Sequence, residues 1–226
     1  MLIKMPEKLR KRTLRERIYE EVVRLILAGE LPSGEWVDEK RVIDKLRVSR
    51  TPFREAIGIL AKVGLVEIKP YRGFYVRSFS RSETADLYEL FKRLECFAVE
   101  LAVPHVNDHD IRRLEEMLIE AGAALQRGDA KIYAMRDREF YENVAGHSEN
   151  SALVEALARV AMQLQLCGTI TGVSPEFTER AVHGCDDIIQ AFKARDIPRA
   201  AFLVRCRINH AQEAILATFT DEAASR

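Results

Sequence analysis

The sequence of 226 residues has no excess charge of either sign and no long hydrophobic run. Its 35 basic residues are balanced by 35 acidic ones, so attraction to a polyanion would need a local excess of positive charge. No stretch of 18 apolar residues occurs, and the N-terminal MLIKMPEKLRKR lacks the apolar segment of a signal peptide. We therefore expect a soluble, cytoplasmic protein without a membrane partner.

Residue patterns of covalent or catalytic chemistry are also scarce. There are four cysteines, without CxxC spacing and without the regular framework of small secreted domains. We expect reduced thiols at Cys96, Cys167, Cys185 and Cys206. No Ser-His-Asp arrangement, glycine-rich phosphate loop or paired-carboxylate motif is apparent, so we expect that the protein is not an enzyme.

The charge is unevenly distributed along the chain. Residues 1–80 contain 18 Lys or Arg against 11 Asp or Glu, whereas residues 81–226 contain 17 against 24. A basic first third favours a module that binds a polyanion, joined to a module with another role. We expect two domains, residues 1–79 and 80–226, with the junction at the polar run from Ser78 to Ser82.

The N-terminal domain has the signals of a winged helix-turn-helix. The elements that we expect are a helix over residues 14–27, a helix after an Asp38 cap to Leu46, a helix over residues 50–62 capped by Ser49 or Thr51, a strand in LVEIKP, a turn at residues 71–73 and a strand in FYVRSF. Pro52 fits the first turn of the third helix, where its missing N–H is not needed.

The third helix of this domain has one apolar face. The residues at helical spacing are Phe53, Ala56, Ile57 and Leu60. Arg50, Thr51 and Arg54 must then face outward. Near the start of a helix in such a motif, outward side chains reach base edges in the major groove, where an arginine matches the two acceptors of guanine.

The rest of the chain has almost only helical periodicity. The expected helices cover residues 83–103, 108–127, 130–146, 151–171, 176–194 and 197–219, with breaks at Gly, Asn, Asp and Pro residues between them. We therefore predict a mainly α protein, in which a winged helix-turn-helix of three helices and a two-stranded wing precedes an all-α bundle of six helices.

Both parts resemble known domains. The run LILAGELPSGEWVDEKRVIDKLRVSRTPFREAIGILAKVGLVEIKPYRGFYV resembles the DNA-binding domain of the GntR superfamily of transcriptional regulators. LYELFKRLECFAVELA, DREFYENVAGHSENSAL and DDIIQAFKARDIPRAA resemble the FCD effector-binding domain of its FadR-like subgroup. The resemblance implies a homodimer that binds a two-fold-related DNA operator and releases it when a small metabolite, often a carboxylate, occupies the helical domain.

The resemblance also assigns candidate DNA contacts. Arg50 and Arg54 would read bases. Lys40 stands where relatives commonly carry an arginine, and a lysine cannot make the planar contact of a guanidinium with DNA. The other candidate contacts, at the DNA backbone, the start of the helix or the tip of the wing, are Lys40, Ser49, Thr51, Arg72 and Gly73.

FCD domains commonly bind a divalent metal, and the positions aligned with its ligands are Asp137, Tyr141, Cys185 and Arg207. Arginine has no lone pair to donate, and tyrosine ligates poorly unless deprotonated. We therefore expect no metal there and no other cofactor. Phe91 stands where relatives often carry an inward arginine, so we expect a less polar site, and Lys92 belongs to a different face.

Helical spacing places Asp137 and Arg207 on apolar faces, where an unpaired charge is expensive. Two interpretations stay open. In the first, Arg207 pairs permanently with Asp137, braces the bundle and closes the cavity, so that the regulator works without an effector. In the second, Arg207 binds the carboxylate of an effector, with Asp137, Tyr141, Cys185 and Phe91 around it.

Overall fold

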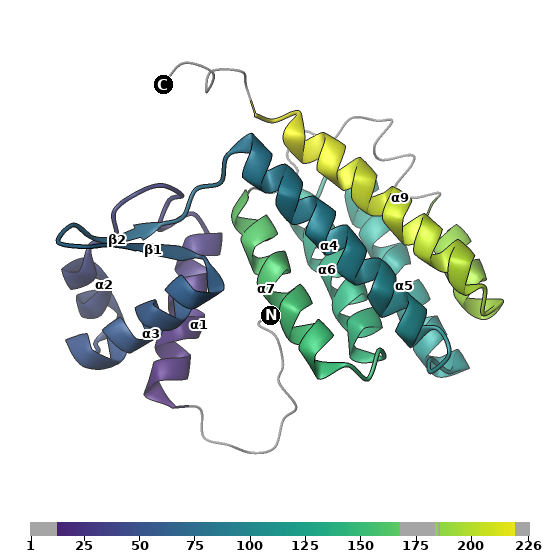
Figure 1. Cartoon of the computed structure of the whole chain (residues 1–226), viewed down its shortest axis with the longest axis horizontal. Helices are drawn as coiled ribbons and strands as arrows, with labels where there is room; N and C mark the ends of the chain where they lie inside the picture. The colour runs from purple at the N-terminus through teal and green to yellow at the C-terminus, as the bar shows by residue number, and fades with distance from the viewer. Residues whose placement is uncertain (1–12, 168–183, 185, 220–226) are drawn as a thin grey trace. The chain divides into compact units, whose positions relative to one another are not determined.

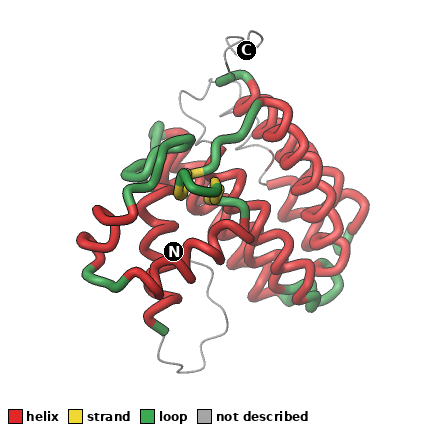
Figure 2. The backbone as a smooth tube through the Cα atoms, turned by 60° about the vertical axis from the view of Figure 1, so that its left-hand side comes forward, coloured by secondary structure: helices red, strands yellow, loops and turns green. Residues whose placement is uncertain are grey.

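The computed structural model describes residues 13–167, 184 and 186–219, and the chain divides into two compact units. The first unit runs to Phe79, and the second begins at Ser80. The fold is mainly helical, as predicted, with one two-stranded sheet among the described residues (Figure 2). No helix in these residues is long and apolar enough to cross a membrane.

The first unit is a three-helix domain with a β-hairpin wing. Its elements are α1 (Leu14–Leu27), α2 (Glu39–Leu46), α3 (Arg50–Val63), β1 (Val66–Lys69) and β2 (Gly73–Val76). The antiparallel strands pair Val66 with Val76 and Lys69 with Gly73. The predicted winged helix-turn-helix is therefore confirmed.

Local signals set the starts of these helices. Thr13 and Glu16 form a capping box at α1, and the Asp38 side chain accepts the backbone N–H of Arg41 at α2. Ser49 takes the N-cap position of α3, but its side chain makes no capping hydrogen bond. Arg47 adopts a left-handed conformation with φ 53° and so allows the tight connection between α2 and α3.

The core of the first unit forms where α1 packs against α3. Phe53 on α3 is fully buried and meets Phe74 of the wing edge to face, with ring centroids 6.3 Å apart. The other core residues on these helices are Ile18, Val22, Val23, Leu25, Ile26, Ala56, Ile57 and Leu60. Burial of these residues fixes which face of α3 remains in solvent.

The second unit is a bundle of helices (Figure 1). Its elements are α4 (Arg81–Ala102), α5 (Asp108–Gln126), α6 (Ala130–Gly146), α7 (Ser151–Cys167), a helical segment at residues 186–193 and α9 (Ile197–Leu216). Helix α4 begins two residues earlier than expected because Ser80 and Glu83 form a capping box. Residues 168–171 and 176–183 of the predicted helices lie outside the described residues.

Helix α4 is the central element of this bundle, because it packs against both α6 and α9. Its buried face includes Phe91, Ala98, Val99 and Ala102. Asn150 caps α7, since its side-chain oxygen accepts the backbone N–H of Leu153 at 3.1 Å. Packing of α6 and α9 on α4 brings together polar groups that are far apart in the sequence.

Candidate functional site

The first turns of α3 present a polar surface. Arg50, Thr51 and Arg54 are exposed, as the helical spacing predicts, while the opposite face of α3 is buried. Ser49, which precedes the helix, and Lys40 on α2 are also exposed. The free backbone N–H groups at a helix start attract anions, and the exposed guanidinium groups add positive charge there.

One of these arginines has a partner. Arg54 Nε donates to Glu39 Oε1 and Arg54 Nη2 donates to Glu39 Oε2, both at 3.0 Å. The hydrogen bonds to Glu39 raise the pKa of Arg54. The Arg54 side chain is nevertheless 63% exposed. Reasoning from the sequence missed Glu39, because no spacing rule relates the start of α2 to the second turn of α3.

The tip of the wing combines an exposed turn with a close packing contact. Tyr71 and Arg72 are exposed, and Tyr71 has a left-handed backbone with φ 61°. Gly73 has φ +97°, and a Cβ atom there would lie 2.9 Å from Nε1 of Trp36. Only glycine satisfies both demands without strain. The turn therefore depends on Gly73 for its shape.

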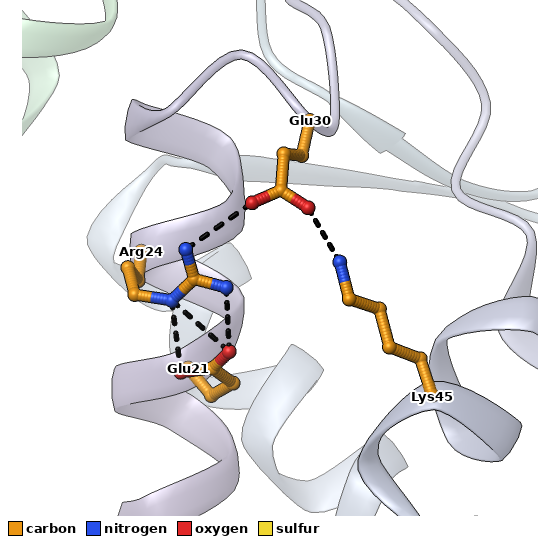
Figure 3. A network of polar contacts seen from close by, with 4 residues as sticks. All are labelled: Glu21, Arg24, Glu30 and Lys45. Atoms are coloured by element: carbon orange, nitrogen blue, oxygen red, sulfur yellow. Dashed lines mark hydrogen bonds and ion pairs between the residues drawn. The ribbon is translucent and has the colours of Figure 1, made fainter.

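A cluster of charged side chains joins α1 to α2. Arg24 donates to Glu21 at 2.7 Å and to Glu30 at 3.2 Å, and Lys45 on α2 pairs with the other oxygen of Glu30 (Figure 3). These side chains are about half exposed, so each pair adds little to stability. Their geometry ties the end of α2 to the end of α1.

In the second unit, Arg207 of α9 and Asp137 of α6 form an ion pair. Arg207 Nε and Nη2 donate to Asp137 Oδ1 at 2.9 Å and 2.6 Å. The Arg207 side chain is 7% exposed and that of Asp137 is 23% exposed. This is the pairing that the first of the two interpretations requires. The guanidinium carbon also lies 6.0 Å from the centre of the Tyr133 ring.

Aromatic side chains pack beside this pair. Tyr141 is buried and meets Phe91 edge to face, with ring centroids 5.7 Å apart. Burial is the main cause that holds the pKa of Tyr141 well above its ordinary value, and the negative charge of Asp137 adds to it. Tyr141 is therefore a neutral hydroxyl at physiological pH. Cys185, the remaining predicted residue, lies outside the described residues.

Sequence reasoning missed Glu95 of α4. Its side chain is 1% exposed, and among the described residues its Oε2 has no hydrogen-bond partner. Burial is the main cause that holds the pKa of Glu95 well above the usual range, and the negative charge of Asp137 adds to it. The sequence offered one signal: Glu95 lies four residues after Phe91 and therefore on the same face of the helix. The surroundings of Asp137 are thus more polar than Phe91 alone suggests.

Lys92 points to a different set of partners. It donates to Asn209 at 2.7 Å and pairs with Glu89, so it links α4 to α9 through polar contacts of its own. Lys92 is buried, and its ammonium group is surrounded by acceptors. Lys92 and the neighbouring Phe91, which meets Tyr141, therefore have different partners.

The donor set around Asp137 does not suit the divalent metal that FCD domains commonly bind. Arg207 occupies one aligned ligand position and already donates two hydrogen bonds to Asp137. A guanidinium has no lone pair and repels a cation. Among residues 13–167, 184 and 186–219, no three His, Cys, Asp or Glu side chains are grouped as a metal site requires.

Comparisons with known proteins cover both units. Residues 14–76 match the family described as bacterial regulatory proteins, gntR family, and residues 86–210 match the FCD domain. The uncharacterized HTH-type transcriptional regulator YdhC of Bacillus subtilis is 25% identical over 195 residues, which cover 86% of this chain and 87% of that protein. The HTH-type transcriptional repressor RspR of Escherichia coli is 28% identical over 127 residues, 56% of either chain.

The fold is similar to that of a solved regulator. The structure of McbR/YncC from E. coli superposes with a TM-score of 0.79 over 91% of this chain and 98% of that chain, at 22% sequence identity. This likeness shows the fold alone.

Proposed function

This chain is a transcriptional regulator of the gntR family with an FCD domain, not an enzyme, and from that premise we propose that it is a repressor. It binds a palindromic operator as a homodimer and releases it when a small metabolite, such as a carboxylate, binds the helical unit. The observation that supports the proposal best is the exposed pair of arginines at the start of α3.

The chemistry of this surface fits base recognition. Arg50 and Arg54 are one helical turn apart, and both are exposed while Phe53 between them is buried. A guanidinium offers donors in a planar fork that matches O6 and N7 of guanine in the major groove. Lys40, Ser49, Thr51, Arg72 and Gly73 would contact the DNA backbone or form the tip of the wing that does so.

The test is a base-by-base measurement on an operator selected from a pool of random duplexes. Arg50→Ala should lower operator affinity by about 1 to 3 kcal/mol and relax preference at one base pair per half-site. Arg113→Ala, which removes an exposed arginine from α5, is the matched control and should leave affinity unchanged. An equal loss on random and selected DNA would count against base reading by Arg50.

The proposed homodimer would match a two-fold operator. One winged domain makes few contacts, and two half-sites double them. Sedimentation of the protein with a duplex of one full operator should give two chains per duplex. One chain per duplex at saturation would contradict the dimer.

The effector site is proposed at the cluster of Asp137, Tyr141, Arg207 and Phe91, with Cys185 as a further candidate. Arg207 attracts anions, but two of its donors are already used by Asp137. A carboxylate effector would have to replace Asp137 at this guanidinium or bind beside it. Ligand binding would therefore change the contact between α6 and α9.

The same ion pair favours a second candidate function, a regulator without an effector whose site is closed by Arg207 and Asp137. A thermal-shift screen with small carboxylates separates the two. A ligand at about 100 times its Kd stabilises the folded protein by about 2.7 kcal/mol and, in the effector hypothesis, also weakens operator binding. No stabilisation by any carboxylate in the screen would favour the closed regulator.

A further inference from the structure

We propose that Glu39 is a positioning residue for sequence recognition: it holds one edge of the Arg54 guanidinium so that the opposite edge is directed to a base. This inference rests on the proposed DNA-binding function, because Glu39 acts through Arg54. It assigns to an acidic side chain a role on a surface that attracts a polyanion.

The geometry leaves the required donors free. A guanidinium has five N–H groups, and Glu39 accepts one from Nε and one from Nη2. The three remaining groups, two on Nη1 and one on Nη2, point away from the carboxylate, and none has a hydrogen-bond partner among the described residues. Two of these can bind guanine O6 and N7 while Glu39 keeps its hold.

The ion pair of Glu39 with Arg54 adds little to stability, although an acid in the first turn of α2 favours that helix. The pair is exposed on the Arg54 side, and such pairs contribute little to folding. Near DNA, a carboxylate repels phosphates and lowers affinity for every sequence. An acid on this surface therefore makes sense where discrimination matters more than affinity.

Glu39 favours discrimination in two ways. It neutralises Arg54, so that this arginine adds little to the sequence-independent attraction of phosphates. It also restricts the rotamers of a long side chain, so that less conformational freedom is lost when the arginine meets a base. Both effects widen the difference between the operator and random DNA.

The test uses the full chain with Glu39→Gln, which removes the charge and keeps the shape. Dissociation constants are measured on the operator, on operators with each base pair replaced in turn, and on random duplex at several salt concentrations. We expect tighter binding to random DNA, with a salt dependence steeper by about one charge per chain. Discrimination at one base pair per half-site should fall by on the order of tenfold, the range of one arginine–guanine contact.

Asp44→Asn is the matched control, because Asp44 is an exposed acid on the same helix. It should tighten random binding without changing the profile of base preference. Glu39→Asp, which keeps the charge but shortens the reach, should lose discrimination and leave the salt dependence unchanged. If Glu39→Gln behaves as Asp44→Asn does, Glu39 supplies only charge and the positioning role is overturned.

A double-mutant cycle separates this inference from the proposed function. In an Arg54→Ala background, Glu39→Gln should have no further effect on base preference, since the residue through which it acts is gone. Additive losses would overturn the inference while the DNA-binding function stands. If neither Arg50→Ala nor Arg54→Ala changes any base preference, the base-reading function itself fails.

Discussion

Each unit of this protein places an arginine against a carboxylate of a neighbouring helix, and the two pairs differ in how far the guanidinium is buried. The Arg54 side chain is 63% exposed beside Glu39, whereas that of Arg207 is 7% exposed beside Asp137. In water, such a pair can be broken or shared with a ligand at little cost to folding. Inside the bundle, removal of one partner leaves a desolvated charge.

This difference indicates a division of roles. The exposed arginine is available for binding, with only one edge held, while the buried arginine is part of the packing between α6 and α9. An anion that takes the same two donors of Arg207 would have to displace Asp137, whereas Glu39 leaves three N–H groups of Arg54 unoccupied. The following experiments test this contrast, from the largest expected effect to the smallest.

The largest effect is expected from Arg207→Leu. This change leaves Asp137 without its cation and should lower the free energy of unfolding by about 3 to 5 kcal/mol, as measured by urea denaturation. The double variant Asp137→Leu with Arg207→Leu should recover most of the loss, because neither charge remains. If Arg207→Leu lowers the free energy of unfolding by less than about 1 kcal/mol, the proposed difference between the buried and the exposed ion pair is contradicted.

Glu95 extends the comparison to a buried acid that has no cationic partner in the part of the chain that the structure describes. Its folded-state pKa is raised, so its contribution to stability is complete below the ordinary glutamate pKa and is lost as the pH rises through the folded pKa. Each pKa unit of difference corresponds to about 1.4 kcal/mol. Glu95→Gln should therefore be more stable than the parent at pH 7 and show a flatter dependence on pH above 5.

Denaturation at pH 4 to 9 measures this effect. At pH 4 the two proteins should be nearly equal, because Glu95 is then protonated in both the folded and the unfolded state. A deficit of the variant that grows as the pH rises would contradict this, because it would mean that the Glu95 carboxylate is ionised and paired in the folded protein.

In the first unit, the backbone of the wing should be more sensitive than the ion pair. Gly73→Ala introduces a Cβ at φ +97° and 2.9 Å from Trp36 Nε1, with an expected loss of about 1 to 2 kcal/mol. Trp36 is the only tryptophan of the chain, so its fluorescence reports the disturbance.

Gly58→Ala in α3 has no atom within 4 Å of the new Cβ and should stabilise the protein by about 0.5 to 1 kcal/mol.

The smallest effect is expected from Arg54→Ala on stability. Loss of this exposed pair should change the free energy of unfolding only slightly, and the difference should shrink at 1 M salt. Its effect on DNA binding should be far larger than its effect on folding. A loss of several kcal/mol in stability would mean that Arg54 belongs to the structure rather than to the binding surface.

Local signals made much of the fold predictable. The cap at Asp38 and the breaks between helices gave bounds close to those observed. The early start of α4 was missed because the capping box of Ser80 and Glu83 begins in a serine-rich run that was interpreted as the junction between the two domains. The spacing of Asp137 and Arg207 on apolar faces indicated the buried pair.

The candidate sites were predictable only in part. Exposure of Arg50 and Arg54 follows from the period of one helix. Glu39 lies on another helix, α2, so its contact with Arg54 depends on how α2 and α3 pack. Glu95 was overlooked because one acid on a long helix is usually solvated. Its burial depends on how α6 and α9 cover α4.

The amino-acid sequence by itself determined where most helices begin and which side of α3 remains in water, because caps and periodicity act over one or two turns. Tertiary structure decided which charges meet: Arg54 with Glu39 across 15 residues, and Arg207 with Asp137 across 70. Such meetings depend on the angle and the offset at which helices pack, and these are properties of the assembled core rather than of any single segment.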